Sequence, residues 1–200
     1  MIKGIIFDVG GVLHTEEAEH FYEDIAGRLR LNREIFMGTH LKLIPLLKLG
    51  KVTEPEYWKI FIKESGSKVP PPKDSLFARE FIRRFKLNRD TLELVKLLKK
   101  KGYKLAVMSD TIIPHRDYDK KMGIYDPFEV RVLSNEVGLA KPDPEMFKLT
   151  LRKLRVEPKE AVYIDDIPDY VEAAKRLGIH AFLFTSLERL ESDLKKLKVV

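Results

Sequence analysis

The chain has 200 residues, of which 44% are hydrophobic, enough for one sizeable domain or a core domain with a smaller insertion. It contains no cysteine, no bilayer-spanning stretch and no signal peptide, which excludes disulfides and thiolate sites and leads us to expect a cytoplasmic protein that binds no membrane. Lys and Arg number 37 against 31 Asp and Glu, but acidic residues separate the basic clusters, so we expect no nucleic-acid partner.

The first predicted element is a strand, Ile5 to Phe7, made of three large apolar residues. Such a short apolar run is typical of a strand that is buried on both faces. Asp8 follows the strand, and Gly10 and Gly11 allow the backbone to turn its amide groups inward. A carboxylate beside this turn could attack a phosphoryl group and hold its oxygens, although an ordinary turn would use the same residue types.

Residues 15–87 have helical spacing and little strand character. Four helices are expected, at residues 21–29, 35–47, 53–62 and 77–85. Pro45 should kink or break the second helix, and residues 65–72, which end in three prolines, should form a loop. Trp58 and Phe61 are interpreted as core residues of this region rather than ligand contacts.

Beyond residue 87, strands and helices alternate. Strands are predicted at 104–108, 129–133, 161–164 and 181–184, and helices at 91–101, 115–122, 144–155, 168–177 and 187–197. Asp143 should cap the helix that Pro144 begins. The alternation predicts an α/β fold with a doubly wound parallel sheet. Residues 1–14 and 88–200 would form this core domain, and residues 15–87 an inserted α-helical cap over the carboxyl edge of the sheet.

Polar residues follow three of the predicted strands: Asp8, Ser109 with Asp110, and Asp165 with Asp166. In a parallel sheet these strand ends meet at one edge, where ligands bind. The adjacent carboxylates of Asp165 and Asp166 repel each other, and hard oxygen ligands favour Mg²⁺, so we expect one of them to bind this metal. The alternative is that one of the pair only caps the helix at Pro168.

These residues and Lys141 form four motifs that resemble those of the haloacid dehalogenase-like superfamily, over the whole chain. The motifs are Asp8-Val9-Gly10-Gly11-Val12, Ser109, Lys141-Pro142-Asp143-Pro144 and Asp165-Asp166. The resemblance implies a Rossmann-like core with a helical cap inserted after the first motif. It also implies that Asp8 is a nucleophile that forms an aspartyl-phosphate.

The resemblance further implies how the site residues divide their roles. Mg²⁺ would be held by Asp8, the Gly10 carbonyl and Asp166, with Asp165 supporting Asp166 or orienting Lys141. Ser109 and Lys141 would hold the phosphoryl oxygens, helped by the Asp110 N–H and by the turn of Val9, Gly10 and Gly11. The substrate implied is a small phosphorylated metabolite, and the oligomeric state is left open.

One position departs from the family pattern. Phosphatases of the family carry a second Asp two residues after the nucleophile, a general acid/base that contributes on the order of 10²–10⁴ in rate. Gly10 occupies that position here. Asp110, His14 or a cap side chain could replace the missing group, or the substrate could be an acyl or sugar-1-phosphate, whose leaving group needs little protonation.

Two further hypotheses stay open at this stage. The first is a metal-free 2-haloacid dehalogenase, although the family pattern for that activity has an aromatic residue near the Gly10 position and no acidic pair. The second is a non-catalytic relative that binds a phosphorylated ligand or a protein partner.

Overall fold

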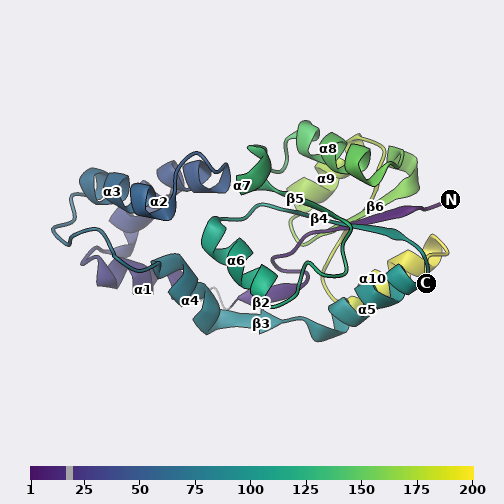
Figure 1. Cartoon of the computed structure of the whole chain (residues 1–200), viewed down its shortest axis with the longest axis horizontal. Helices are drawn as coiled ribbons and strands as arrows, with labels where there is room; N and C mark the ends of the chain where they lie inside the picture. Colours follow the sequence, from purple (N-terminus) through teal and green to yellow (C-terminus); the bar gives the residue numbers. More distant parts are fainter. Residues whose placement is uncertain (17–19) are drawn as a thin grey trace.

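The computed structural model describes residues 1–16 and 20–200, so residues 17–19 of the predicted cap lie outside the described residues. Figure 1 shows a sheet region that holds both chain ends, with helices α1 to α4 lying to one side of it. A short two-stranded ladder, β2 with β3, lies between the two regions.

Five parallel strands form the central sheet, in the order β5-β4-β1-β6-β7. They are Gly4–Phe7 (β1), Lys104–Ser109 (β4), Val130–Leu133 (β5), Ala161–Asp165 (β6) and His180–Leu183 (β7). Phe7 pairs with Val107 on one side and with Ile164 on the other, so the carboxyl ends of the three central strands lie level. The predicted α/β fold with a parallel sheet is confirmed.

Helices cover both faces of this sheet. Side chains alternate along a strand, so Ile5 and Phe7 pack on one face and Ile6 on the other. The first face is covered by α5 (Arg89–Lys100) and α10 (Leu187–Lys196), the second by α8 (Pro144–Leu154) and α9 (Pro168–Arg176). Each fully buried large apolar side chain contributes about 1.5–3 kcal/mol to folding.

The remaining connections are short. They contain α6 (Ile113–Lys121), α7 (Ser134–Val137) and a 3₁₀ turn, Pro158–Glu160. The sequence analysis did not predict α7, whose single turn is too short to have a periodic pattern. Across the described ranges, 1–16 and 20–200, no helix combines the length and apolar character that crossing a membrane requires.

The helices α1 (Phe21–Arg28), α2 (Arg33–Lys48), α3 (Glu54–Ser65) and α4 (Leu76–Arg84) have a core of their own, and we call them the helical unit. Trp58 and Phe61 lie in that core, as expected, and the ring of Trp58 stacks on Phe77 with centroids 4.9 Å apart. The role of this unit as a cap, and the boundaries after residues 14 and 87, stay predictions.

The link between the two regions differs from the prediction. A helix was expected through Phe85, but α4 ends at Arg84, and Phe85–Leu87 (β3) pairs antiparallel with His14–Glu16 (β2). The two crossings of the chain run side by side, so each supplies the backbone partners that the other needs. Asn88 ties this ladder to the turn after β1, because its side-chain amide donates to the Val12 carbonyl at 3.1 Å.

Pro45 does not break α2, so the predicted break is wrong. The helix continues through Pro45 to Lys48. Proline lacks the amide that would bond the carbonyl of Leu41, one turn earlier. Leu41 is 64% exposed, so the missing hydrogen bond falls on the solvent side of the helix.

Candidate functional site

Asp8 and Asp165 lie side by side because of the register of their strands. Phe7 pairs with Ile164, and the next residue on each strand is an aspartate. The Asp8 amide donates to the Ile164 carbonyl at 2.9 Å, which continues the ladder to the edge of the sheet. Both side chains are buried, and one oxygen each from Asp8, Asp165 and Asp166 lie within 4.8 Å of one another.

Lys141 lies between the two buried aspartates. Its Nζ is 2.8 Å from Asp8 Oδ1 and 2.8 Å from Asp165 Oδ2. Its backbone amide donates to Asp110 Oδ1 at 2.9 Å, which fixes the Lys141 loop to the end of β4. The loop then enters α8, where Asp143 Oδ1 accepts from the Glu145 amide at 2.9 Å. The predicted role of Asp143 as the N-cap residue of this helix is confirmed.

Burial dominates the electrostatics of this edge. It raises the pKa of Asp8 to about 6, although the nearby Lys141 ammonium acts in the opposite direction. Burial alone would lower the pKa of Lys141, but Asp8 and Asp165 outweigh it and raise that pKa. Burial also raises the pKa of Asp110, and burial together with Asp165 raises the pKa of Asp166. A further cation at this edge would relieve the excess of negative charge.

The two neighbouring aspartates have different surroundings. Asp165 Oδ2 accepts from Lys141 and from the Tyr163 hydroxyl, and its Oδ1 accepts from the Ile167 amide at the start of α9. Asp165 thus accepts from the residue that precedes α9, but no side chain among the described residues caps the helix itself, which does not favour the capping alternative. The Asp166 carboxylate is exposed, and no side chain of residues 1–15 or 20–200 makes a hydrogen bond or an ion pair with it.

Gly11 makes room for the Asp166 carboxylate. A Cβ built on Gly11 would lie 2.1 Å from Asp166 Oδ2, and the Gly11 φ of +74° is one that other residues rarely adopt. Oxygens of Asp8 and Asp166 lie within 4.8 Å of each other, and carboxylate oxygens are hard ligands of the kind that Mg²⁺ prefers. The donor set fits a magnesium ion.

A cavity of about 510 Å³ opens above these residues. Seven predicted site residues line it: Asp8, Gly10, Gly11, Ser109, Asp110, Lys141 and Asp166. Of the other two, Val9 is buried behind the turn, and Asp165 is fully buried and contacts Lys141. His14, a candidate proton donor, does not line the cavity; its Nε2 lies 3.4 Å from Asp119 Oδ1.

The remaining lining residues were not singled out from the sequence. They are Thr15, Lys48, Ile167 and Tyr170. Tyr170 follows the acidic pair in the first turn of α9, and its ring lies 4.9 Å from Lys141 Nζ, a position that could have been noticed. Lys48 carries no comparable sequence signal, because its place depends on how the helical unit packs against the sheet region.

Comparison with known proteins finds a hydrolase family and, among the relatives, two named phosphatases. A family model described as haloacid dehalogenase-like hydrolase matches residues 2–178. The phosphorylated carbohydrates phosphatase of Thermotoga maritima is 29% identical, over 89% of this chain and 82% of that protein. The glyceraldehyde 3-phosphate phosphatase of Methanopyrus kandleri is 28% identical, over 90% of this chain and 82% of that protein.

Other relatives match in part or in fold alone. The bifunctional epoxide hydrolase 2 of Sus scrofa is 24% identical over 98% of this chain, but the chain spans only 38% of that protein. A HAD family enzyme from Bacteroides thetaiotaomicron superposes with a TM-score of 0.81 at 24% identity, covering 95% of this chain and 98% of that one. A second structure of that enzyme, a complex with magnesium and inorganic phosphate, has a TM-score of 0.78 at 24% identity, over 95% of this chain and 99% of that one.

Proposed function

The chain belongs to the haloacid dehalogenase-like hydrolases, and we propose that it is a Mg²⁺-dependent phosphatase of a small phosphorylated metabolite. One observation carries the proposal. Three carboxylates, Asp8, Asp165 and Asp166, lie together at the end of the sheet that opens to the cavity, and the buried Lys141 ammonium pairs with only two of them, Asp8 and Asp165. This arrangement leaves negative charge that a divalent cation neutralises, and it keeps a carboxylate oxygen facing the place where a phosphoryl group fits.

In this proposal, Asp8 attacks phosphorus and forms an aspartyl-phosphate. Lys141 Nζ and the Ser109 hydroxyl donate to the phosphoryl oxygens, together with the Asp110 N–H and the turn of Val9, Gly10 and Gly11. Asp165 orients Lys141 through the 2.8 Å contact with its Nζ. Because these donors are fixed by the sheet edge before the substrate arrives, they stabilise the transition state without rearranging.

Asp8, the Gly10 carbonyl and Asp166 are the groups that would hold Mg²⁺. Asp166 suits direct coordination better than Asp165, because both Asp165 oxygens already accept hydrogen bonds from Lys141, Tyr163 and Ile167. When bound, the metal neutralises charge on the phosphoryl oxygens and allows a carboxylate to approach them.

The substrate class follows from the cavity and from the relatives. The cavity of about 510 Å³ is small and is lined mostly by polar groups, which suits a compact phosphorylated metabolite. The named phosphatases among the relatives act on phosphorylated carbohydrates and on glyceraldehyde 3-phosphate, which supports a substrate of that kind. A cytoplasmic location and the absence of a nucleic-acid partner belong to the same proposal.

The direct test is phosphate release from p-nitrophenyl phosphate. We expect release that requires Mg²⁺, stops when a chelator is added and is lost in Asp8→Asn. Asp169→Asn, a change at an exposed residue of α9 that does not line the cavity, is the matched control and should keep full activity. Beryllium fluoride should bind to the wild-type protein and not to Asp8→Asn.

Other outcomes would point to the other hypotheses. Chloride release from 2-chloropropionate without metal would indicate a dehalogenase. Binding of phosphate or beryllium fluoride with no turnover of any phosphate ester would indicate a non-catalytic relative. Either result would contradict the phosphatase proposal.

A further inference from the structure

The helical unit contributes one cation to the cavity, Lys48, among the residues that the structure describes. Lys48 is the last residue of α2 and is half-buried. No carboxylate of residues 1–15 or 20–200 lies within ion-pair distance of its ammonium. Lys42, on the same helix but outside the cavity, is 3.3 Å from Glu64 instead. Lys48 therefore faces the substrate space without a carboxylate partner.

A backbone contact sets the position of Lys48. A Cβ built on Gly50, two residues later, would lie 2.2 Å from the Asn135 carbonyl oxygen, and the Gly50 φ is +64°. Only glycine allows this end of α2 to press so closely against α7, which follows β5. The charge of Lys48 reaches Asp110, whose pKa it lowers against the larger, opposite effect of burial. Lys48 and Asp110, the residue after β4, therefore line the same cavity from the helical unit and from the sheet region.

The lining residues of the sheet region offer poorer candidates for a proton donor to the leaving group. Gly10 holds the place where related phosphatases carry their acid/base Asp, and a Cβ built on Gly10 would meet no atom within 4 Å. Asp110 Oδ1 already accepts from the Lys141 amide, and His14 lies outside the cavity lining. Burial raises the pKa of the Tyr170 hydroxyl, which makes it a weaker acid.

We propose that Lys48 is the proton donor to the leaving group, in a reaction that rests on the phosphatase function proposed above. As an Asp8 oxygen bonds to phosphorus, the bond from phosphorus to the leaving oxygen breaks. A proton passes from Lys48 Nζ to that oxygen, which leaves as an alcohol. Lys48 is left as a neutral amine.

The second half of the reaction restores both residues. A water oxygen bonds to phosphorus, and the bond from phosphorus to Asp8 breaks. One proton of that water passes to the Lys48 amine, so inorganic phosphate leaves and the ammonium is regained. Lys48 thereby does from the helical unit what a carboxylate at position 10 would do from the sheet edge.

The test is a series of substituted phenyl phosphates and one alkyl phosphate, ordered by the basicity of the leaving oxygen, with kcat/KM measured for each. In Lys48→Met we expect kcat/KM for p-nitrophenyl phosphate to change little, because p-nitrophenolate leaves without a proton. The most basic leaving group should lose about 10²–10⁴-fold. The fall of kcat/KM with leaving-group basicity should therefore be steeper in Lys48→Met than in the wild type. In the control, Lys42→Met, it should match the wild type.

Two further variants separate a proton donor from a simple charge. Lys48→Arg keeps the charge but gives up a proton far less readily, so it should behave like Lys48→Met on the basic leaving groups. Gly10→Asp in the Lys48→Met background should restore the shallow dependence, because the open space at Gly10 accepts a carboxylate.

Several results would overturn the Lys48 proposal. One is an equal loss on every substrate, or no loss on any; another is full activity of Lys48→Arg on the basic leaving groups. With Asp8-dependent turnover intact, each of these leaves the phosphatase function standing. If Asp8→Asn changes nothing, the phosphatase function itself fails, and the Lys48 proposal fails with it.

Discussion

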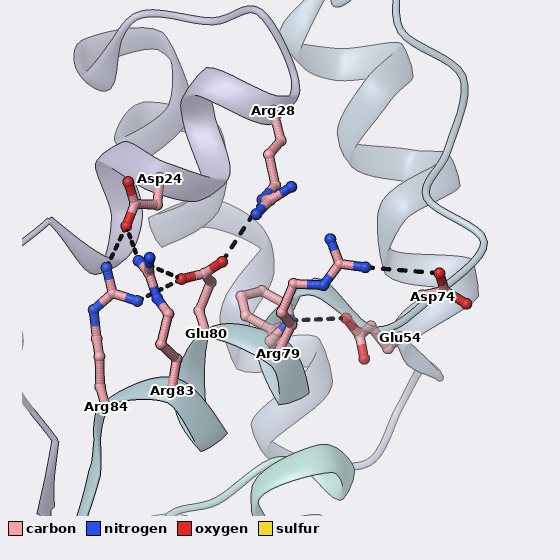
Figure 2. Close-up of polar contacts among 9 residues, drawn as sticks. Asp24, Arg28, Glu54, Asp74, Arg79, Glu80, Arg83 and Arg84 are labelled. Carbon is pink, nitrogen blue, oxygen red and sulfur yellow. Dashed lines mark hydrogen bonds and ion pairs between the residues drawn. The ribbon is translucent and has the colours of Figure 1, made fainter.

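Two clusters of buried charge differ in how far they are neutralised. In the helical unit, Glu80 is fully buried, accepts a hydrogen bond from Arg84 and forms an ion pair with Arg83, and Arg28 Nε lies 3.6 Å from its other oxygen. Asp24 on α1 accepts from the same two arginines of α4. Figure 2 shows these side chains converging between the two helices. Within the described part of the chain, two carboxylates lie among three guanidinium groups, and the network joins α1 to α4.

The sheet edge has the opposite balance. Asp8, Asp165 and Asp166 have one ammonium, Lys141, among them, and burial raises the pKa of Asp8 to about 6. A network with all its carboxylates paired stabilises the fold and has nothing left to bind. A network short of positive charge is costly to fold and is ready to bind a cation. The two clusters should therefore respond in opposite directions when a carboxylate is removed.

The largest effect is expected from Asp8→Asn. Loss of the nucleophile should lower kcat about 10⁴–10⁶-fold. The same change should raise the free energy of unfolding at pH 7 without metal, by about 1–3 kcal/mol. The reason is that the folded protein holds the Asp8 proton up to a pH of about 6 and the unfolded chain only to about 3.8, so ionised Asp8 destabilises the fold above that window. Urea unfolding at pH 4 and pH 7 measures this, and an Asn variant less stable at pH 7 would contradict it.

Glu80→Gln should act in the opposite direction. It leaves the buried Arg84 with one carboxylate fewer, at a cost of about 3–5 kcal/mol in the free energy of unfolding. Glu64→Gln, which breaks the exposed pair with Lys42, is the matched control and should cost less than about 1 kcal/mol. Equal costs for the two variants would break the comparison between the clusters.

His40 gives the helical unit a dependence of stability on pH that is opposite in sign to the one expected from Asp8. Burial lowers its pKa to about 4, and its Nδ1 lies 2.7 Å from the Tyr57 hydroxyl. The unfolded chain binds a proton at His40 below about 6.5, so stability is present above that pH and is lost as the pH falls towards 4, by up to about 3 kcal/mol.

Urea unfolding measured from pH 7 to pH 4 tests this effect. His40→Gln should make the free energy of unfolding less dependent on pH, though not independent of it. Some slope should remain, because burial also lowers the pKa of His115, to about 3. An unchanged curve for His40→Gln would show that this histidine does not contribute.

Asp166→Asn sharpens the comparison within the sheet edge itself. We expect about 10–100-fold weaker Mg²⁺ binding, measured by calorimetry or by the metal dependence of turnover, with little change in unfolding without metal. Asp165→Asn should instead lower stability, because it removes the partner of Lys141, Tyr163 and Ile167. The reverse pattern would assign the metal to Asp165.

The sequence was sufficient to predict the parallel sheet and to predict that residues far apart in the chain meet at its edge. Asp8, Ser109 and Asp165 each end an apolar run, and parallel strands bring such ends together. The sequence could not separate Asp165 from Asp166, because the difference lies in which carboxylate meets Lys141. It also missed Lys48 and the β2–β3 ladder, since both depend on how the helical unit meets the sheet.

The ladder of β2 and β3 brings both junctions of the helical unit to one place. Entry and exit there are neighbours, so a different insert with the same two ends could replace this one without disturbing any strand of the sheet. In the proposed reaction the sheet region supplies the nucleophile Asp8 and the helical unit supplies the proton donor Lys48, so an exchanged insert would have to bring its own proton donor.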